Sequence, residues 1–463
     1  MALSLRSALL GSALVAAVAG SAMAEDAASG ADPASGLRGS LPTGSGYGTT
    51  TVVEPATTGT LGTFGTDGEA GETGETDGTT GEAVPADALA DAGEEDPYEP
   101  LGIRSGGMVY LPKVELRAGW TNNGERTRGG GDARYLEIAP ELVGKSDWSR
   151  HSLELSLRGT YRDYVGGDID AEPSLSALAK GRLDLRETTA IELSAGYDLT
   201  REEAFDPDVA GVVDRPLIHG LSGSIGLAEE VGSFEVKPLA SVARTIYERD
   251  TSGASRNSTL VEGGLRLTHL GGTLHPFVEG LALRRLYDDE VDGNGQRRAA
   301  LGGELRGGLE FDYDEILTGE VAVGYRRETL KEPALADLEG WTLAGDVTWT
   351  VSALTKVTVD ARTDFNPSTV LGASGSVRHQ ADIRLTHALR RNVVVDLGLA
   401  LGREEYTGLD RTDTTLEASA GATYKINRTA AVTARARHER FATTVPGEDY
   451  TANSFEVGLT LQR

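Results

Sequence analysis

The feature that most constrains this chain is an alternation of apolar and polar residues that recurs from residue 109 to residue 463. Over residues 153–161 the odd positions are apolar or small, whereas the even positions carry charged or hydroxyl side chains. The same pattern recurs over residues 191–195, 301–311, 341–349, 377–385 and 455–461. Successive side chains of a β-strand point to opposite faces, so these segments predict strands with one apolar and one polar face. Residues 234–247 and 274–287 break the alternation partway, so we expect either β-bulges in both or segment boundaries at other positions.

The links between the alternating segments are short and long in turn. Short links lie near residues 144–149 and 187–189, and longer polar links occupy residues 202–215 and 288–298. The chain holds about eighteen segments of roughly nine to twelve residues, the length that a tilted strand needs to cross a bilayer. Short turns on one rim and longer loops on the other are typical of bacterial outer-membrane barrels. No link approaches roughly thirty residues, so we expect no dedicated constriction loop, and either a wide pore or one closed by the N-terminal segment.

An aromatic residue precedes the longer links, with a spacing that averages about forty residues. Forty residues is about the length of one up-and-down hairpin with its two connections, so nine hairpins give about eighteen strands. Amphipathic rings are favoured where hydrocarbon meets water, and we expect an aromatic girdle there. The girdle candidates are Trp120, Tyr161, Tyr197, Tyr287, Tyr325 and Phe365, and Tyr247, Tyr406 and Phe441 recur at the same point of the repeat. A soluble propeller has a similar period, but the Gly-His and Trp-Asp pairs of its blades are missing.

The predicted fold is all-β: a closed, antiparallel, up-and-down transmembrane β-barrel of about eighteen strands. Closure is needed because an open sheet in lipid would leave the backbone groups at its edges without hydrogen-bond partners. If the apolar faces contact lipid, charged residues of both signs line the interior and form cross-strand ion pairs. The pore-lining candidates are Arg158, Arg182, Arg306, Arg326, Arg362, Arg384, Arg435, Arg437, Glu304, Glu310, Asp382 and Glu417. The alternative is that these charges only hydrate the wall and set no selectivity.

Composition excludes several other classes of protein. The 463 residues include no cysteine, which excludes a disulfide scaffold and a thiolate metal site. Beyond residue 24 no stretch approaches the roughly eighteen apolar residues of a membrane-spanning helix. The 71 acidic residues outnumber the 44 basic ones, and the net charge of -27 would repel the phosphates of a nucleic acid.

The first hundred residues divide into two segments. Residues 1–24 combine a basic residue, an apolar stretch and a small-residue cleavage pattern, which predicts a cleaved secretory signal peptide. Residues 25–100 hold 16 acidic residues and one basic residue, Arg38, among many Gly, Thr and Ala. Such a composition buries too little apolar surface to offset chain entropy, so we expect a disordered acidic segment that acts as a spacer or, alternatively, a plug. The barrel is then expected over residues 101–463.

No catalytic motif stands out in the sequence. The seven histidines form no His-Glu-x-x-His pair, and neither a Gly-x-Ser-x-Gly elbow nor a Walker loop is present. Residues 288–295 resemble the opening of a calcium loop, but the twelfth position, which should be acidic, is Ala299. We therefore expect no enzymatic activity, no cofactor and no metal site, and we assign residues 288–295 to a turn.

Several strand ends combine arginine, tyrosine and an acidic residue, as in Leu-Arg-Arg-Leu-Tyr-Asp at 283–288 and Gly-Tyr-Arg-Arg-Glu at 324–328. With the acidic leader and the eighteen-strand pattern, these ends resemble the "putative beta-barrel porin 2" family of proteobacterial outer-membrane proteins. The resemblance covers about residues 101–463 and implies an outer-membrane barrel without catalytic residues, some members being linked to polysaccharide export. One departure is the final sequence Leu461-Gln462-Arg463, because outer-membrane barrels commonly end in an aromatic residue.

Three functions follow from this interpretation. The first is a porin-like passive channel for small hydrophilic solutes in the cell outer membrane. The second is a barrel for export of a surface polysaccharide, with periplasmic export partners and sugar-stacking aromatic residues on the inner face, where Tyr135 is the clearest of few. The third is a structural outer-membrane protein without transport. The expected partners are outer-membrane lipid and lipopolysaccharide and the barrel-assembly machinery, and no nucleic acid.

Overall fold

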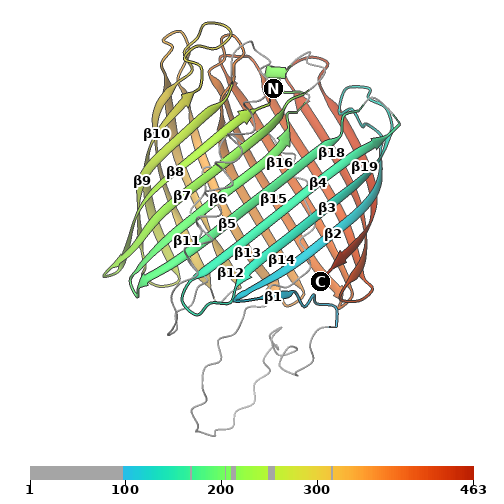
Figure 1. The fold of residues 1–463 in the computed structure, drawn as a ribbon. Coiled ribbons are helices and arrows are strands. Elements are labelled where there is room, and N and C mark those ends of the chain that lie inside the picture. The colour runs from blue at the N-terminus through green and yellow to red at the C-terminus, as the bar shows by residue number, and fades with distance from the viewer. Residues whose placement is uncertain (1–96, 167–168, 204, 210–214, 249–255, 314–315) are drawn as a thin grey trace.

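The structure is a computed structural model that describes residues 97–463, except for 167–168, 204, 210–214, 249–255 and 314–315 (Figure 1). The predicted signal peptide lies outside the described residues, as does the predicted acidic segment apart from residues 97–100. Within the described part, no helix has the length and apolar character needed to cross a membrane.

Nineteen antiparallel strands form one sheet, and the sheet closes because β19 pairs with β2, with Leu459 opposite Leu116. The predicted barrel of about eighteen strands is confirmed: β2 to β19 form the wall, and the three-residue β1 pairs with β2. The strands are β1 Ile103–Ser105, β2 Met108–Thr121, β3 Ala133–Ser146, β4 Ser152–Val165, β5 Glu172–Arg186, β6 Thr189–Arg201, β7 Leu217–Val231, β8 Phe234–Tyr247, β9 Ser258–His269, β10 Leu274–Tyr287, β11 Ala300–Tyr313, β12 Leu317–Leu330, β13 Leu338–Ser352, β14 Thr355–Asn366, β15 Gly375–Arg390, β16 Val393–Thr407, β17 Thr412–Lys425, β18 Ala430–Thr443 and β19 Tyr450–Gln462.

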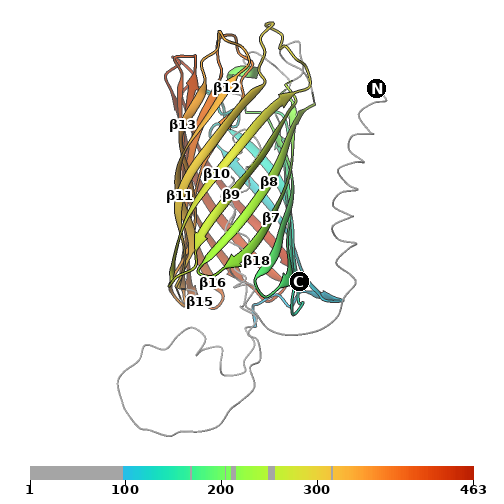
Figure 2. The same ribbon diagram turned by 90° about the vertical axis from the view of Figure 1, so that its left-hand side faces the viewer.

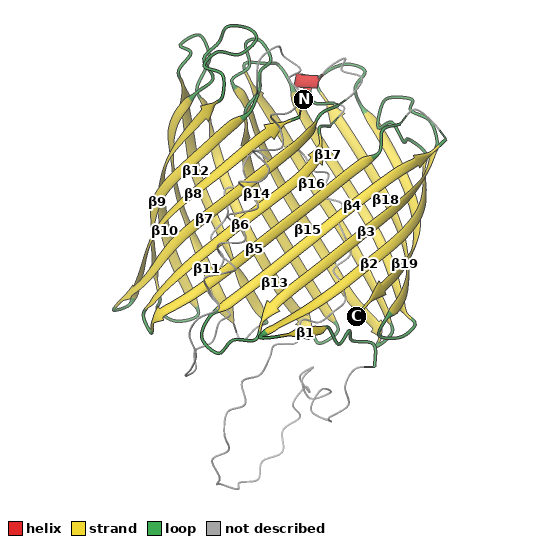
Figure 3. Ribbon diagram, viewed as in Figure 1, coloured by secondary structure: helices red, strands yellow, loops and turns green. Residues whose placement is uncertain are grey.

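The two rims of the barrel differ, as predicted. β5 and β6 are joined by residues 187–188 at one rim, whereas β6 and β7 are joined by residues 202–216 at the other. We call these the short-turn rim and the long-loop rim. The strands slant across the wall between them, and the C-terminus lies at the short-turn rim (Figures 1 and 3). Most of the wall strands are longer than the predicted nine to twelve residues, up to 16 in β15, because pairing continues beyond the apolar stretch.

The two faces of the wall carry opposite kinds of side chain. On β3, Leu136 and Ile138 face outward with 58% and 43% of their surface exposed, whereas Glu137 between them is 5% exposed inside the barrel. Large apolar residues on the outer face match the chemistry of lipid chains, and the charged residues gather inside. The alternation in the sequence therefore predicts correctly which side chains face each way.

The barrel is broad in Figure 1 and much narrower in Figure 2, so its cross-section is flattened. Opposite walls approach each other across the lumen. Arg362 on β14 lies near enough to Asp198 on β6 for their charges to interact.

The predicted bulges at 234–247 and 274–287 are wrong. β8 pairs with β9, and β10 with β11, without a shift in register. The alternation fails there because apolar residues also point inward, where Leu283 packs against Ala243 and Leu260. Register shifts occur instead next to short turns, at Asp184/Arg186, Thr350/Ser352 and Ala388/Arg390.

Candidate functional site: a constriction in the barrel lumen

The twelve pore-lining candidates all lie on the inner face of the wall. Residues that lie opposite each other on paired antiparallel strands point to the same face of the sheet. Each candidate lies opposite another candidate or another inward-facing residue. Glu304 lies opposite Arg326, Arg306 opposite buried Glu279, and Arg435 opposite Glu456. The remaining candidates follow the same parity: Arg158, Arg182, Arg362, Arg384, Arg437, Glu310, Asp382 and Glu417. Whether they set selectivity stays a prediction.

One cluster of inner charges joins β9, β10, β11 and β12. The Arg266 guanidinium lies 2.7 Å from a Glu320 carboxylate oxygen and 3.1 Å from one of Glu310. Arg306 forms an ion pair of 2.5 Å with Glu279, which lies 3.9 Å from Arg266. The Arg266 guanidinium also lies 3.6 Å from the centroid of the Phe277 ring. Buried ion pairs need such multiple partners to offset the loss of water.

The same network continues towards the long-loop rim. Arg326 bridges Glu262 on β9 at 3.0 Å and Glu328 on its own strand at 2.7 Å. The Nε and Nη2 atoms of Arg285 also donate to the Glu328 carboxylate at 3.0 Å each, and Arg285 donates to the Phe365 carbonyl oxygen. These contacts tie β9, β10 and β12 together on the inside of the barrel and link them to the end of β14.

The loop between β6 and β7 turns into the lumen, which overturns the expectation that no link forms a constriction. Its first residue, Glu202, is fully buried and forms a double ion pair with Arg256, at 2.7 Å for each oxygen. The Glu202 amide donates to the Pro216 carbonyl, and Arg215 donates to the Glu202 carbonyl at 2.9 Å. The first and last residues of the loop are thus hydrogen-bonded to each other at the barrel wall.

Phe205 fixes the loop to the distant wall formed by β18 and β19. Its ring centroid lies 4.2 Å from that of Phe441 and 6.3 Å from that of Tyr450, and the latter two rings stack at 5.3 Å. The Phe205 carbonyl oxygen accepts a hydrogen bond of 2.7 Å from Arg411, which is itself bound to Asp413. An apolar anchor and a charged donor therefore hold the same loop residue.

A second anchor holds the loop against the link between β14 and β15. Here the chain forms η2, a single 3-10 turn over Pro207–Val209. The Asp208 carboxylate accepts hydrogen bonds from the amide and the hydroxyl of Thr369. Arg298 braces this link, because its guanidinium donates to the carbonyl oxygens of Ser368 and Val370. The described part of the loop thus contacts the wall at Phe205 and the β14–β15 link at Asp208.

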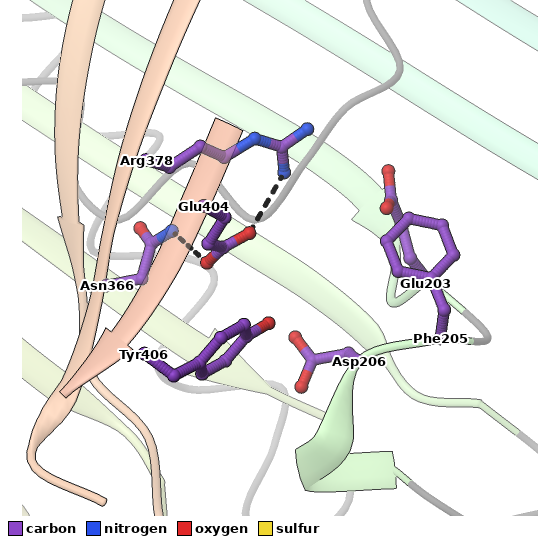
Figure 4. A pocket seen from close by; sticks show the side chains of 7 residues that line it. All are labelled: Glu203, Phe205, Asp206, Asn366, Arg378, Glu404 and Tyr406. Atoms are coloured by element: carbon purple, nitrogen blue, oxygen red, sulfur yellow. Dashed lines mark hydrogen bonds and ion pairs between the residues drawn. The ribbon is translucent and has the colours of Figure 1, made fainter. Parts of the chain in front are cut away.

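Between the loop and the wall lies a polar pocket (Figure 4). Glu203, Phe205 and Asp206 line it from the loop, and Asn366, Arg378, Glu404 and Tyr406 line it from the wall. Glu404 is held by Asn366, which donates at 3.2 Å, and by Arg378 at 3.8 Å. The pocket therefore brings three carboxyl groups and one guanidinium together between the loop and the wall.

The loop carboxyl groups are shifted towards their neutral form. Burial raises the pKa of Glu203 to about 7, against the pull of the Arg378 charge. Burial and the nearby carboxylates of Asp208 and Glu202 raise the pKa of Asp206 well above its usual range. Loss of water disfavours a charged carboxylate, and like charges add to that effect. The charge of this constriction therefore changes with pH.

The girdle candidates divide between the two faces. Trp120, Tyr161 and Tyr325 face outward with 42%, 51% and 42% of their surface exposed. Tyr197 lies opposite Leu221 and donates or accepts a hydrogen bond with His219 at 2.9 Å, near the long-loop rim. The girdle itself stays a prediction for these four residues.

Two girdle candidates lie on the inner face instead, which corrects their assignment. Tyr287 lies opposite Ser258, an inward-facing and buried residue, so it shares that face. Phe365 is 5% exposed, packs with Leu338 and Val377, and lies under the Arg326 guanidinium. The pairing of β13 with β14 ends before Phe365, which frees the end of β14 to turn its ring inward.

The expectation of few inner aromatic residues is also wrong. A set of rings lies inside the barrel: Phe277 near the short-turn rim, and Tyr135, Tyr164, Tyr247, Phe365, Phe441 and Tyr450 near the long-loop rim. Each is at most 9% exposed, and several lie beside a guanidinium, as Tyr135 does 4.4 Å from Arg162. These rings pack the wall and the loop together. The sequence signal for the loop was Phe205, an aromatic residue within an otherwise acidic link.

Among the described residues, no group of three or more His, Asp or Glu side chains is arranged to hold a metal ion. In the predicted turn at 288–295, the Asp292 carboxylate accepts from the amides of Asn294 and Gln296 and pairs with Arg298 at 2.7 Å. Its oxygens thus hold the loop itself together.

The family model of "Putative beta-barrel porin 2" matches residues 96–463, the whole of the described barrel. This chain belongs to that family. It is an outer-membrane β-barrel, so the long-loop rim faces the outside of the cell and the short-turn rim the periplasm. Membership indicates a transport-type barrel rather than an enzyme. No curated protein matches the chain in sequence.

Solved barrels are only distantly similar. The copper transporter OprC is 10% identical with a TM-score of 0.40, over 78% of this chain and 81% of its own. The outer membrane protein opdK from Pseudomonas aeruginosa is 10% identical with a TM-score of 0.39, over 76% of this chain and 99% of its own. The ferric enterobactin receptor PfeA of the same species, as a G324V mutant, is 6% identical with a TM-score of 0.37, over 76% and 80%.

Proposed function

We propose that this outer-membrane barrel is a porin-like passive channel for small hydrophilic solutes, narrowed by the loop between β6 and β7. The observation that carries the proposal is the anchoring of that loop across the lumen, with Phe205 against Phe441 and Asp208 against Thr369. A loop fixed at both places reduces the free cross-section without closing it by a separate domain. The polar pocket beside it, lined by Glu203, Arg378 and Glu404, favours hydrated polar solutes over apolar ones.

The charged wall supports the same function. Ion pairs such as that of Arg182 with Glu192 leave the inner surface polar and almost neutral, which suits water and uncharged or weakly charged solutes. Arg158 is the clearest exception, because 54% of its side chain stays exposed to the lumen although it pairs with Glu141.

The test is reconstitution of the purified full chain in a planar bilayer and in liposomes. A passive channel gives steady single-channel openings, and liposomes that contain it swell in solutions of small sugars. Correctly folded protein, identified by its heat-modifiable mobility on a gel, that gives neither openings nor swelling would overturn the proposal.

A second function, export of a surface polysaccharide, is favoured by the inner aromatic residues, because sugar rings stack on aromatic faces. Phe441 and Tyr450 are 1% and 6% exposed, however, and Phe205 covers them. Export would therefore require the loop to leave these rings. Binding of a polysaccharide that quenches the current only after Phe205 is removed would favour this function over a passive channel.

A further inference from the structure

A regular set of outward-facing arginines lies near the long-loop rim. In β8, β10, β12, β16 and β18 the first five outward positions hold no Asp, Glu, Lys or Arg, and the sixth is an arginine. In β16, for example, Val393, Val395 and three leucines precede Arg403 on the outer face. We call this set the arginine collar, and it comprises Arg244, Arg284, Arg327, Arg403 and Arg440.

The pairing of the strands places the first three collar residues in one row. Arg244 lies opposite Thr259 of β9, which lies opposite Leu286 of β10, and Arg284 is two residues before Leu286. Arg284 in turn lies opposite Leu301 of β11, which lies opposite Thr329 of β12. Arg327 is again two residues before that position. The row therefore steps by two residues for every two strands.

The same step recurs on the other side of the barrel. Arg403 lies opposite Thr414 of β17, which lies opposite Ala442 of β18, and Arg440 is two residues before Ala442. A shift of one residue per strand moves the row by about 3.3 Å along the strand direction for each interstrand distance of about 4.8 Å. The row is therefore inclined by about 35° to the line perpendicular to the strands. This slope equals the usual tilt of strands in outer-membrane barrels, so the row runs at a constant height around the wall.

The height of the collar matches the edge of a bilayer. Each collar arginine stands ten residues after the first residue of its strand, as Arg284 does after Leu274. Ten residues along a strand tilted by about 35° rise about 27 Å, close to the apolar band of about 25 Å on such barrels. The collar thus lies where the hydrocarbon ends and the headgroups of the outer leaflet begin.

Two collar residues keep their charge available. Arg284 and Arg440 are exposed and form no ion pair with any residue that the structure describes. Arg327 and Arg403 pair with carboxylates but stay 61% and 59% exposed. A guanidinium presents paired N–H donors that match a phosphate group, with more geometric fit than an ammonium.

From this placement we propose that the arginine collar binds the phosphate groups of an anionic glycolipid of the outer leaflet. The lipid chains would lie on the apolar outer positions below, and the phosphates would accept hydrogen bonds from Arg284 and Arg440. The proposal rests on the outer-membrane location and is independent of whether the barrel conducts.

The test measures binding of a bisphosphorylated diglucosamine lipid, lipid A, to the full chain in detergent, with its dephosphorylated form as the comparison probe. The wild type is expected to bind the phosphorylated lipid more tightly. R284Q and R440Q are each expected to weaken that binding about fivefold, the effect of one surface arginine near an anionic headgroup. The matched control is R391Q, which removes an exposed charge from the short turn between β15 and β16 at the opposite rim.

Two results would overturn the proposal: equal binding of the two lipids by the wild type, or an equal loss of binding in R391Q and R440Q. Heat-modifiable mobility identifies folded protein for each variant. If a glutamine variant does not fold, R284K and R440K keep the charge and are expected to retain most of the binding, which a lipid-independent effect would not predict.

Discussion

The wall of β9–β12 and the loop between β6 and β7 both place carboxylates inside the barrel, but they neutralise them in different ways. In the wall, Glu320 lies 2.7 Å from Arg266, and pairs of this kind repeat from strand to strand. In the loop, Glu203 and Asp206 share their pocket with Glu404 and with one guanidinium, that of Arg378. The wall neutralises its carboxylates by pairing, whereas in the pocket of the loop burial favours the protonated forms of Glu203 and Asp206.

This difference separates two tasks. Ion pairs make the wall costly to break, since each partner left alone would be a buried charge. The loop rests on a few contacts, chiefly that of Phe205 with Phe441, and its charge depends on pH. The wall therefore supplies stability, and the loop supplies a constriction that conditions can change.

Breaking the wall should give the largest effect. Arg266→Ala leaves Glu279, Glu310 and Glu320 without a shared partner, and we expect the free energy of unfolding to fall by about 3–5 kcal/mol. The measurement is urea unfolding in lipid vesicles followed by gel mobility. Arg297→Ala is the control, because Arg297 is 58% exposed and pairs with Glu290 at 3.7 Å, a contact worth less than about 1 kcal/mol. Equal losses in the two variants would contradict the contrast.

Releasing the loop should give a smaller and local effect. Phe205→Ala removes the ring that packs on Phe441 and Tyr450, at a cost of about 3 kcal/mol of anchoring. Hydrogen exchange should accelerate at residues 205–209, while the midpoint of global unfolding stays nearly constant. Phe234→Ala, which removes an outward-facing ring 44% exposed, serves as the control and should leave the exchange of the loop unchanged.

The smallest effect is a dependence of the current on pH. Docking of the loop raises the pKa of Glu203 from an ordinary 4.5 to about 7, so docking favours the protonated group. The docked loop is then most stable below the ordinary pKa and loses stability as the pH rises towards 7, above which the loss is constant. We expect single-channel conductance to increase between pH 5 and pH 8, with Asp206 adding to the change.

Glu203→Gln together with Asp206→Asn should flatten this pH profile, because neither replacement can ionise. Glu290→Gln is the matched control, since Glu290 is a 75% exposed acid on another long loop. A profile that stays as steep in the double variant as in the wild type would show that other groups, such as Glu404, carry the pH dependence.

The sequence predicts the wall well and the loop poorly, for physical reasons. The positions of the strands and the face to which each side chain points follow from the alternation of apolar and charged residues. The apolar residues contact lipid and the charged residues lie inside, as Leu136 and Glu137 do. The sequence does not show that Tyr287 faces inward. The inward-facing residues before it include both apolar Leu283 and charged Arg285, so side-chain polarity does not distinguish the two faces of this strand.

The loop could not be predicted from local pattern. Contacts such as that of Asp208 with Thr369 join residues 161 positions apart, and the local sequence around either residue does not indicate its partner. Phe205 was the one local signal, since an aromatic ring in an acidic link needs an apolar partner that only the closed barrel provides.

The most direct test of the account compares the single-channel conductance of the wild type with that of a variant in which residues 203–214 are replaced by four Gly and Ser residues. A matched variant shortens the link between β18 and β19, residues 444–449, at the same rim. The account predicts a conductance at least twofold higher when the β6–β7 loop is shortened and an unchanged value for the matched variant. Equal conductance in all three proteins, each folded, would contradict the claim that this loop forms the constriction.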